Sequence, residues 1–480
     1  MSDAASTDTT SRPAQKRSSG PVFLILSGVA LVLSAGALAG SWLLVNGYFG
    51  APASNKNIVD ILDTAAARAE TSRSADDLAF LNSLATNLVA PNGNADELST
   101  AARLQFSIAN SFYDQGARDS ASAAATSGAN NYSLAKRTNG SSAAELWLQW
   151  KDMTAKAKSG DAPDPVETNW QAAGSVAKQL VAIDAVNVQF LRANWLSSRR
   201  VVDAMRTSED TATAEAEAST AVDAARQVTK LRPTQQSYSR DLWISLIAKG
   251  DLLFRNEKLA DSKSAYEEAL TLAQAAVKAV PNDRSQGDLY STLIKLGSVN
   301  AKSGDIATAR TNFKAALDLA TASAAANATM QSNAIQAQVR LADLEQDAGD
   351  IAASKAFYEQ AIAGGNQLVA SDPTNLAFAR DLARNYASLG AVAATQKDVA
   401  GATAAYGSSA KLRATILSAE PSNVVYHREL VAAYEKLAQT TKDASTWKLA
   451  TRAAENLGKH AEANDSDRKL VNRVMQGAAK

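Results

Sequence analysis

The sequence predicts an all-α protein: an α-solenoid of helix hairpins preceded by one N-terminal transmembrane helix. Three observations predict this class. An internal similarity recurs every 45 to 48 residues, alanine is abundant while aromatic residues make up only 6% of the 480, and no charged side chain occurs between Ser18 and Asn55. Alanine is the best helix former and lets helices approach closely, so the composition favours packed helices. No segment shows the sustained alternation of apolar and polar residues that indicates strands.

The N-terminal region is predicted to anchor the chain in a membrane. Residues 1–20 are polar and are expected to form a disordered tail, and residues 21–49 are expected to hold the anchor. The apolar stretch Val22 to Val45 contains 24 residues. As a helix it would span about 36 Å, and about 20 residues suffice to cross the hydrocarbon core.

A cleavable signal peptide is the competing interpretation of this segment. The basic pair Lys16-Arg17, the apolar run and Ala37-Leu38-Ala39 are similar to the three regions of such a peptide. Apolar character resumes in Trp42-Leu43-Leu44-Val45, which makes the run longer than a typical signal core. The length favours an uncleaved anchor, and sequencing of the mature amino terminus would distinguish the two.

Basic residues and small residues predict how the anchor is oriented and how it associates. Arg12, Lys16 and Arg17 precede the span, which favours a cytoplasmic amino terminus and a periplasmic, extracytoplasmic C-terminal domain in a cell inner membrane. Gly36 and Gly40 form a GxxxG spacing that permits a homodimer.

The repeat is the strongest signal in the chain. Same-type residues stay in phase through four successive units, at offsets of 47, 45 and 48 residues. Aligned positions include Gly250 with Gly297; Tyr266 with Phe313, Tyr358 and Tyr406; Asp305 with Asp350 and Asp398; and Pro373 with Pro421. A fifth, partial unit pairs Tyr386 with Tyr434, and an earlier unit pairs Trp195 with Trp243. Such periodicity is typical of an array of stacked structural repeats.

Each unit is predicted to contain two helices joined by a short turn. Leu289, Leu293 and Leu296 recur at helical spacing in the first helix. Gly304 supplies the left-handed turn that ends this helix, and Asp305 can cap the next one. We therefore expect a helical domain of divergent repeats or a cap over residues 50–188, the repeat array over 189–441, and C-terminal capping helices over 442–480.

These units resemble the tetratricopeptide repeat (TPR). The residues that carry the resemblance are Leu296-Gly297, Gly304, Ala309, Phe313 and Ala316. In that family small residues permit close helix contact and one aromatic side chain fills the gap between the helices. The period of 45 to 48 exceeds the usual 34 of the family, so the resemblance is to a long-period variant with longer helices.

The resemblance implies a protein-binding role for the first helix of each hairpin, because these helices line the concave wall of such arrays. We call the residues that it places on this wall the predicted face. They are Ile244, Ile247, Asp251, Phe254 and Arg255; Ser291, Ile294, Ser298, Ala301 and Lys302; Gln336, Val339, Asp343, Gln346 and Asp347; and Arg384, Ala387 and Ala391. The face lacks the basic pattern that holds a peptide's terminal carboxylate, since Asp251 and Asp343 would repel one.

Composition argues against most chemistry. The sequence has no cysteine and only two histidines, His427 and His460, so the usual metal ligands and general bases are scarce, and we expect no cofactor, no metal and no catalytic residue. The 49 basic and 49 acidic residues give zero net charge, hence no general attraction for nucleic acid. His427 with Glu429 is a possible acid/base pair, but a solvent-facing histidine is the simpler interpretation.

The expected function is that of a non-catalytic, membrane-anchored scaffold for protein–protein interaction in the bacterial cell envelope. Alternatives are a cleaved, exported periplasmic binding protein and a purely structural, self-assembling array. Another is a cell-wall hydrolase with its catalytic unit in residues 57–188, for which Glu145, Asp152 and Asp161 are the residues to mutate. Trp147 and Trp150 lie on one helix face and are interpreted as core, or else as a ligand-stacking patch.

Overall fold

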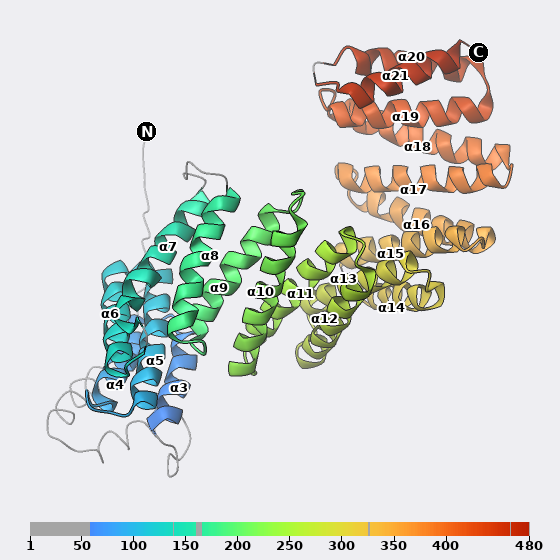
Figure 1. Cartoon of the computed structure of the whole chain (residues 1–480). Coiled ribbons are helices and arrows are strands. Elements are labelled where there is room, and N and C mark those ends of the chain that lie inside the picture. Colours follow the sequence, from blue (N-terminus) through green and yellow to red (C-terminus); the bar gives the residue numbers. More distant parts are fainter. Residues whose placement is uncertain (1–57, 138, 160–165, 325–326, 461, 480) are drawn as a thin grey trace, which may run out of the picture. The chain divides into compact units, whose positions relative to one another are not determined.

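The computed structural model describes residues 58–137, 139–159, 166–324, 327–460 and 462–479. These residues form helices joined by short turns and contain no strand, so the predicted all-α class is confirmed for this part of the chain (Figure 1). None of the helices within the described ranges has the length and apolar character needed to cross a membrane. The predicted span Val22–Val45, with Gly36 and Gly40, lies outside the described residues.

The chain divides into two units, and the division passes through two helices. The first unit contains the described residues up to Ser159 together with Ala172–Ala193, and the second contains the start of α8 and everything from Asn194 onward. Helices α3 to α9 have the following bounds: α3 Ile58–Ala69, α4 Ala75–Leu88, α5 Ala95–Asp114, α6 Arg118–Leu134, the 3-10 helix η1 Gly140–Ser142, α7 Ala143–Ser159, α8 Val166–Ile183 and α9 Val188–Ala204.

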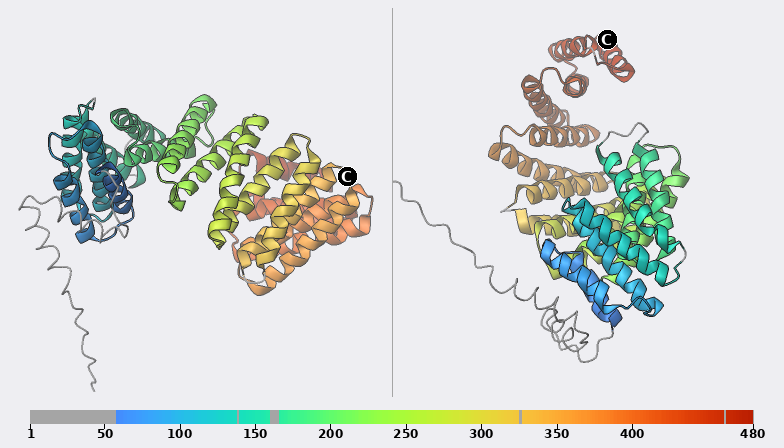
Figure 2. Two further views of the ribbon diagram at one scale, coloured as in Figure 1. Left: turned by 90° about the horizontal axis from the view of Figure 1, so that it is seen from below. Right: turned by 90° about the vertical axis from the view of Figure 1, so that its left-hand side faces the viewer.

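The second unit continues as a succession of long helices. Their bounds are α10 Thr211–Leu231, α11 Gln236–Arg255, α12 Leu259–Ala279, α13 Asp283–Lys302, α14 Ile306–Ala324, α15 Ala328–Asp347, α16 Ile351–Ser371, α17 Leu376–Thr395, α18 Val399–Ala419, α19 Val424–Thr441, α20 Ala444–Gly458 and α21 Asp465–Ala478. Each helix packs against the next one along the chain, as the views of Figure 2 also show. We call α9, α11, α13, α15, α17, α19 and the final helix α21 the first helices, and α10, α12, α14, α16, α18 and α20 the second helices.

The two helices of a hairpin approach closely where a glycine meets an aromatic ring. A Cβ on Gly250, Gly297 or Gly390 would overlap the ring of Tyr266, Phe313 or Tyr406 respectively. All three rings are buried. This is the small-residue and aromatic pairing that the TPR resemblance implies, and it recurs with the period of the sequence repeat.

The turn from first to second helix passes through the left-handed region in five successive hairpins. One residue in each has a positive φ: Glu257 at 61°, Gly304 at 83°, Gly349 at 87°, Lys397 at 60° and Lys442 at 54°. The predicted left-handed turn at Gly304 is thus confirmed. Glycine occupies this conformation without strain, whereas lysine and glutamate do so at a cost.

Neighbouring first helices are joined by side-chain bonds that repeat along the array. The Arg240 guanidinium donates to Asp288 at 2.7 and 3.1 Å. Arg428 makes the corresponding ion pair with Asp467. An indole N–H adds a second kind of link, because Trp243 donates to Thr292 Oγ1 at 2.9 Å. These bonds connect residues 39 to 49 apart in the sequence, and they hold the hairpins that they join against each other.

The first unit has a core of its own that contains buried polar groups. Arg103 Nε donates to Asp184 at 2.7 Å and the Tyr132 hydroxyl donates to the same carboxylate at 2.9 Å. Asn187 Nδ2 in turn donates to the Tyr132 oxygen at 2.8 Å. Burial, followed by the charge of Asp184, raises the pKa of Tyr132 well above its usual value. The network joins α5 and α6 to the turn between α8 and α9.

The tryptophans singled out in the sequence belong to this core. Trp147 is 1% exposed and Trp150 is 7% exposed. Trp147 meets Phe106 edge-to-face, with 6.3 Å between the ring centroids. The interpretation of the pair as core is confirmed, and the alternative of a ligand-stacking patch is wrong because neither ring offers an open face.

Candidate protein-binding surfaces

The predicted face lies on four first helices of the second unit. Its members on α11, α13, α15 and α17 are half-buried or exposed, so their side chains reach the surface in part. Arg255, Lys302, Gln336 and Arg384 are exposed. The structure brings some of these residues together in two surface hollows and engages others in packing or in local ion pairs.

The first hollow lies between α9 and α11, and we call it the α9–α11 hollow. It has a volume of about 360 Å³ and unites Ile244, Ile247, Asp251 and Arg255 of the predicted face. The residues that line it are Arg199, Val202, Asp203, Arg206, Trp243, Ile244, Ile247, Ala248, Asp251, Leu252 and Arg255. Its floor is therefore apolar, and its charged residues lie on both helices.

The carboxylates of the α9–α11 hollow are already paired within the chain. Asp251 accepts from the Tyr266 hydroxyl and from Lys295 Nζ, each at 2.6 Å. Asp203 forms an ion pair with Arg199. Burial and the charge of Asp251 raise the pKa of Tyr266 above its usual value, which keeps the hydroxyl a donor. Lys295 thus offsets the negative charge that the sequence alone assigns to this place.

Two arginines of the α9–α11 hollow keep their charge available. Arg206 and Arg255 are exposed, and neither makes an ion pair with any described residue. Arg206 and Lys295 were absent from the predicted face. Lys295 was missed because it lies 44 residues from Asp251 in the sequence, and a residue-spacing argument within one helix does not reach it.

The second hollow lies between α13 and α15, and we call it the α13–α15 hollow. It measures about 410 Å³ and unites Ser298, Ala301, Asp343, Gln346 and Asp347 of the predicted face. Phe313, Arg340 and Leu344 complete its lining. Asp343 accepts a hydrogen bond from the Tyr358 hydroxyl, which repeats the bond of Tyr266 to Asp251 two hairpins earlier.

The remaining members of the predicted face lie outside these hollows. Ile294 and Val339 pack against the buried clusters between helices. Lys302 lies over the ring of Phe254, with Nζ 5.0 Å from its centroid. Arg384 pairs with Asp381 on its own helix at 2.9 Å. Ser291, Gln336, Ala387 and Ala391 line neither of the two hollows.

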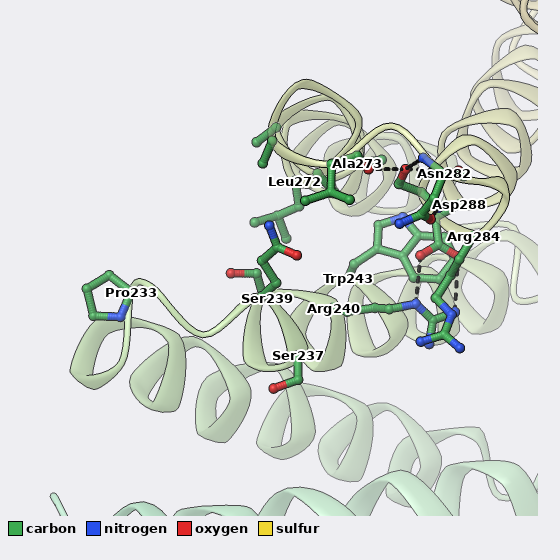
Figure 3. Close-up of a pocket in the computed structure, with 16 residues that line it drawn as sticks. Pro233, Ser237, Ser239, Arg240, Trp243, Leu272, Ala273, Asn282, Arg284 and Asp288 are labelled. Atoms are coloured by element: carbon green, nitrogen blue, oxygen red, sulfur yellow. Dashed lines mark hydrogen bonds and ion pairs between the residues drawn. The ribbon is translucent and has the colours of Figure 1, made fainter. Parts of the chain in front are cut away.

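A third hollow had no counterpart in the sequence analysis, and we call it the α11–α13 recess (Figure 3). Its volume is about 400 Å³, and it is bounded by the start of α11, the end of α12 and the start of α13. Its lining is Pro233, Gln236, Ser237, Ser239, Arg240, Trp243, Leu272, Ala273, Ala275, Ala276, Ala279, Val280, Asn282, Arg284, Ser285 and Asp288. In the sequence, this recess could have been suspected from the alanines near the end of α12, which are too small to fill the space beside Trp243.

The residues considered for catalysis are not arranged as a catalytic group. Glu145 and Asp152 are exposed on α7, and Asp152 pairs with Lys156 at 2.8 Å. Asp161 lies outside the described residues. Within the described ranges no three His, Asp or Glu residues come together as a metal site.

The two histidines meet each other at the end of the array. Their ring centroids are 5.5 Å apart. His427 Nε2 lies 2.9 Å from the Pro421 carbonyl oxygen, and His460 Nε2 lies 2.9 Å from that of Ser422. Glu429 pairs instead with Arg380 and Arg413. The acid/base pair considered for His427 and Glu429 is therefore not formed.

Comparison with known proteins yields no family model that matches and no curated protein that matches. Among solved structures, the chain is similar to BtubC from P. vanneervenii, with 18% identity, 56% of this chain and 93% of that chain covered, and a TM-score of 0.38. It is also similar to a tetratricopeptide repeat protein from Parabacteroides merdae, with 11% identity, 70% and 99% covered, and a TM-score of 0.35. The C-terminal part of a TPR repeat-containing protein from Cytophaga hutchinsonii gives 14%, 67% and 99%, and 0.36. At such scores the helix-hairpin architecture rests on the contacts of this chain itself.

Proposed function

We propose that this protein is a non-catalytic scaffold that binds protein partners through the first helices of its second unit. The observation that carries the proposal is the pair of hollows on those helices, each with apolar residues below charged ones. Partly buried apolar surface with a polar surround is typical of protein-binding sites. Both hollows draw on equivalent positions of different hairpins, so one extended partner has more than one place to dock.

A protein partner fits these hollows better than a small substrate does. Each hollow has room for one or two side chains, and each includes exposed residues, such as Arg206 and Arg255 in one and Arg340 and Asp347 in the other. A small ligand would keep much of its surface in water there, whereas enzymes bury most of theirs. A polypeptide instead adds contacts from hollow to hollow.

Site-specific photo-cross-linking in the native cell tests this proposal. A photoreactive residue at Arg255 or Gln346 places the probe in a hollow, and one at Glu267 or Ala307 places it on an exposed position of a second helix. We expect the same partner protein to be captured from both hollows and not from the second helices. Equal capture from all four positions, or capture from none, would contradict a partner bound at the first helices.

We also propose that Val22–Val45 anchors the scaffold in the inner membrane, with the amino terminus in the cytoplasm and the helical units in the periplasm. The uncharged stretch from Ser18 to Asn55 and the basic residues before it support this. Partner proteins would then be envelope or membrane proteins, and Gly36 and Gly40 would permit a dimer.

Fractionation and amino-terminal sequencing test the anchor. We expect the protein in the membrane fraction, with its amino terminus retained and its helical units digested only when protease reaches the periplasm. A mature protein that begins near Gly40 and is released in soluble form would instead support the cleaved, exported binding protein. Digestion from the cytoplasmic side alone would reverse the proposed orientation.

A further inference from the structure

The α11–α13 recess is an apolar surface depression, and the side chain of Trp243 lies at its floor. Trp243 is 9% exposed, and its only N–H group already donates to Thr292. The ring therefore offers an occupant apolar contact and no free donor. Small residues on α12, Ala273 and Ala276 among them, leave the space open above the ring. An apolar side chain is the group that gains most from entering it.

The polar side of the recess carries a positive charge that the chain does not neutralise. Asp288 accepts both of its hydrogen bonds from Arg240, through Nε and Nη2. Nη1 of Arg240 makes no hydrogen bond within the described residues, and Arg284 is exposed and forms no ion pair with any of them. Figure 3 shows the guanidinium groups of Arg240 and Arg284 close to each other at the same side of the recess. After the Arg240–Asp288 pair is balanced, the charge of Arg284 remains.

The next unit of the array does not carry the two side chains that characterise the recess. One unit further along, Gly287 stands in the place of Arg240 and Tyr290 in the place of Trp243. The Tyr290 hydroxyl donates to the Asn333 carbonyl oxygen at 2.7 Å, and its ring packs with Ala316 and Ala320 of α14. The stacking of hairpins therefore does not require an open recess with two arginines.

The surround of the recess limits what kind of occupant it suits. Pro233, Gln236, Ser237, Ala275 and Val280 are exposed, so the depression is open to solvent along its edges. A free small molecule would remain largely hydrated there. One side chain of a longer segment can fill the depression while the rest of the segment lies across the edges.

We propose that the α11–α13 recess is a further docking site, next to the α9–α11 hollow with which it shares Trp243, for a partner segment that carries an apolar side chain next to an aspartate or glutamate. The apolar side chain lies against Trp243, Leu272 and Ala276. The neighbouring carboxylate accepts from Arg284 and from Nη1 of Arg240. Arginine suits this role because its planar group can donate to both oxygens of a carboxylate.

Binding of labelled hexapeptides to the full-length protein tests the site. The reference probe has a Leu-Glu pair at its centre between glycine and serine residues, with blocked termini. The matched probes carry Leu-Gln or Ser-Glu, and fluorescence anisotropy gives the affinities. We expect saturable binding of the Leu-Glu probe, and at least about tenfold weaker binding of each matched probe, because one of the two contacts is lost.

Two substitutions locate the binding on the molecule. Arg284→Gln removes the available charge, and Ala276→Leu fills the recess with the protein's own side chain. Each is expected to weaken the Leu-Glu probe at least about tenfold. Lys314→Gln and Ala307→Leu make the same changes at exposed positions of α14 and are expected to leave the affinity unchanged. Thermal unfolding of every variant verifies that it is folded. If Ala276→Leu does not fold, Arg284→Gln still tests the site, because Arg284 is exposed and its substitution is not expected to affect folding.

Several results would overturn the proposal. They are the absence of saturable binding, equal affinities for the Leu-Glu and Leu-Gln probes, and unchanged binding to Arg284→Gln. Free N-acetylleucine that binds as tightly as the hexapeptide would make the recess a small-molecule site and would also overturn it. None of these results bears on the hollows of the first helices, whose test is separate.

Discussion

At the scale of single residues, the array tolerates exceptions at positions where its geometry is fixed. In five of the six described turns between first and second helices one residue has a positive φ; two of these residues are glycine and the other three are lysine or glutamate. A left-handed conformation costs a non-glycine residue about 1 kcal/mol or somewhat more. The backbone conformation is thus set by the packing of the two helices, and the residue type changes only the free-energy cost of adopting it.

Exchange of residues at this turn should change stability in opposite directions. Lys397→Gly is expected to stabilise the protein by about 1 kcal/mol, and Gly304→Ala to destabilise it by about the same amount. Gly287→Ala is the matched control: this glycine lies inside α13 with no atom near a new Cβ, so alanine should stabilise by about 1 kcal/mol. Urea unfolding followed by circular dichroism measures all three. A loss of stability in Lys397→Gly would show that the lysine side chain contributes more than the strain costs.

A buried lysine in the first unit should make stability depend on pH. Lys151 is 7% exposed, and its Nζ donates to Asn110 Oδ1 at 2.7 Å and lies 4.4 Å from the centroid of the Tyr113 ring. Burial lowers the pKa of Lys151 to about 8, against the opposing effect of Asp114. In the unfolded chain its pKa is about 10.4. Between these values the unfolded state holds a proton that the folded state has released, so stability rises as pH increases through this window.

Lys151→Met should remove this dependence. We expect the variant to be more stable than the natural protein at pH 7, by an amount on the order of 3 kcal/mol at most, and the two to converge as pH rises from 8 toward 10. Tryptophan fluorescence reports unfolding, because Trp147 and Trp150 lie beside the lysine. Lys156→Met, on the exposed side of the same helix, should leave the pH profile as it is. A natural protein whose stability does not rise above pH 8 would refute the argument.

At the scale of elements, the second helices share a way of starting. Aspartate is the N-terminal capping residue of α10, α14, α16, α18 and α20, where its side chain accepts from backbone N–H groups of the first turn. Only α12, among the described second helices, begins differently, with Lys258 at that place. Lys258 instead forms an ion pair with Glu215 of α10 at 2.6 Å. At the start of α12 the aspartate cap is thus absent, and the lysine in its place forms an ion pair with the neighbouring second helix α10.

The aspartate caps should make the starts of these helices sensitive to acid. Hydrogen bonds from the Thr308 side chain and backbone lower the pKa of Asp305, and Thr213 does the same for Asp210. Because the folded pKa lies below the unfolded one, this stabilisation is present above the unfolded value of about 3.9 and is lost as pH falls through the lower folded value.

Hydrogen exchange of the first turn of α14 can detect the loss. On acidification below pH 4, we expect protection of this turn to decrease more in the natural protein than in Asp305→Asn, which keeps an acceptor oxygen but cannot be protonated in this range. Asp305→Ala should lower the protection already at neutral pH. If the three proteins were equally protected at neutral pH, the cap would not contribute to the helix start.

At the scale of the whole molecule, ion pairs between successive first helices extend the array to its last helix. Asp467 of α21 is fully buried and receives the Arg428 guanidinium from α19, as well as the N–H of Asn464 at its own helix start. The hydrogen bond from Arg428 is the main cause that lowers the pKa of Asp467. Asp467 thus completes the capping box of α21, whose N-cap is Asn464, and also ties the helix to the preceding hairpin.

Removal of this arginine should loosen the end of the array. Arg428→Gln leaves a buried carboxylate without its cation, and we expect a loss of about 2 kcal/mol, reduced from the usual cost because the arginine side chain is 34% exposed. Hydrogen exchange should increase in α20 and α21 and remain unchanged in α11 and α12. Arg468→Gln breaks the exposed pair with Asp465 and should change stability by less than about 0.5 kcal/mol. Equal effects of the two substitutions would mean that the buried pair has no special weight.

The local features of this protein were determined by the sequence. The helical class, the turn at Gly304 and the cap at Asp305 could be predicted because each depends on a few neighbouring residues, and the repeat displays them several times. The pairing of a small residue with an aromatic ring was implied by the TPR resemblance. The TPR resemblance placed Ile247, Asp251, Ser298 and Asp343 on one face, but it did not identify which of these positions form hollows.

Only the tertiary structure decided which charges and spaces remain available to a partner. Lys295 offsets Asp251, and Arg240 offsets Asp288, across more than forty residues of sequence. The recess above Trp243 exists because alanines on another helix leave it unfilled. Charge balance and empty volume depend on distances of a few ångströms between residues that are remote in the chain, and small differences in helix packing change both. A repeat pattern specifies the scaffold, which is the same in every unit, whereas a binding surface arises where the units differ.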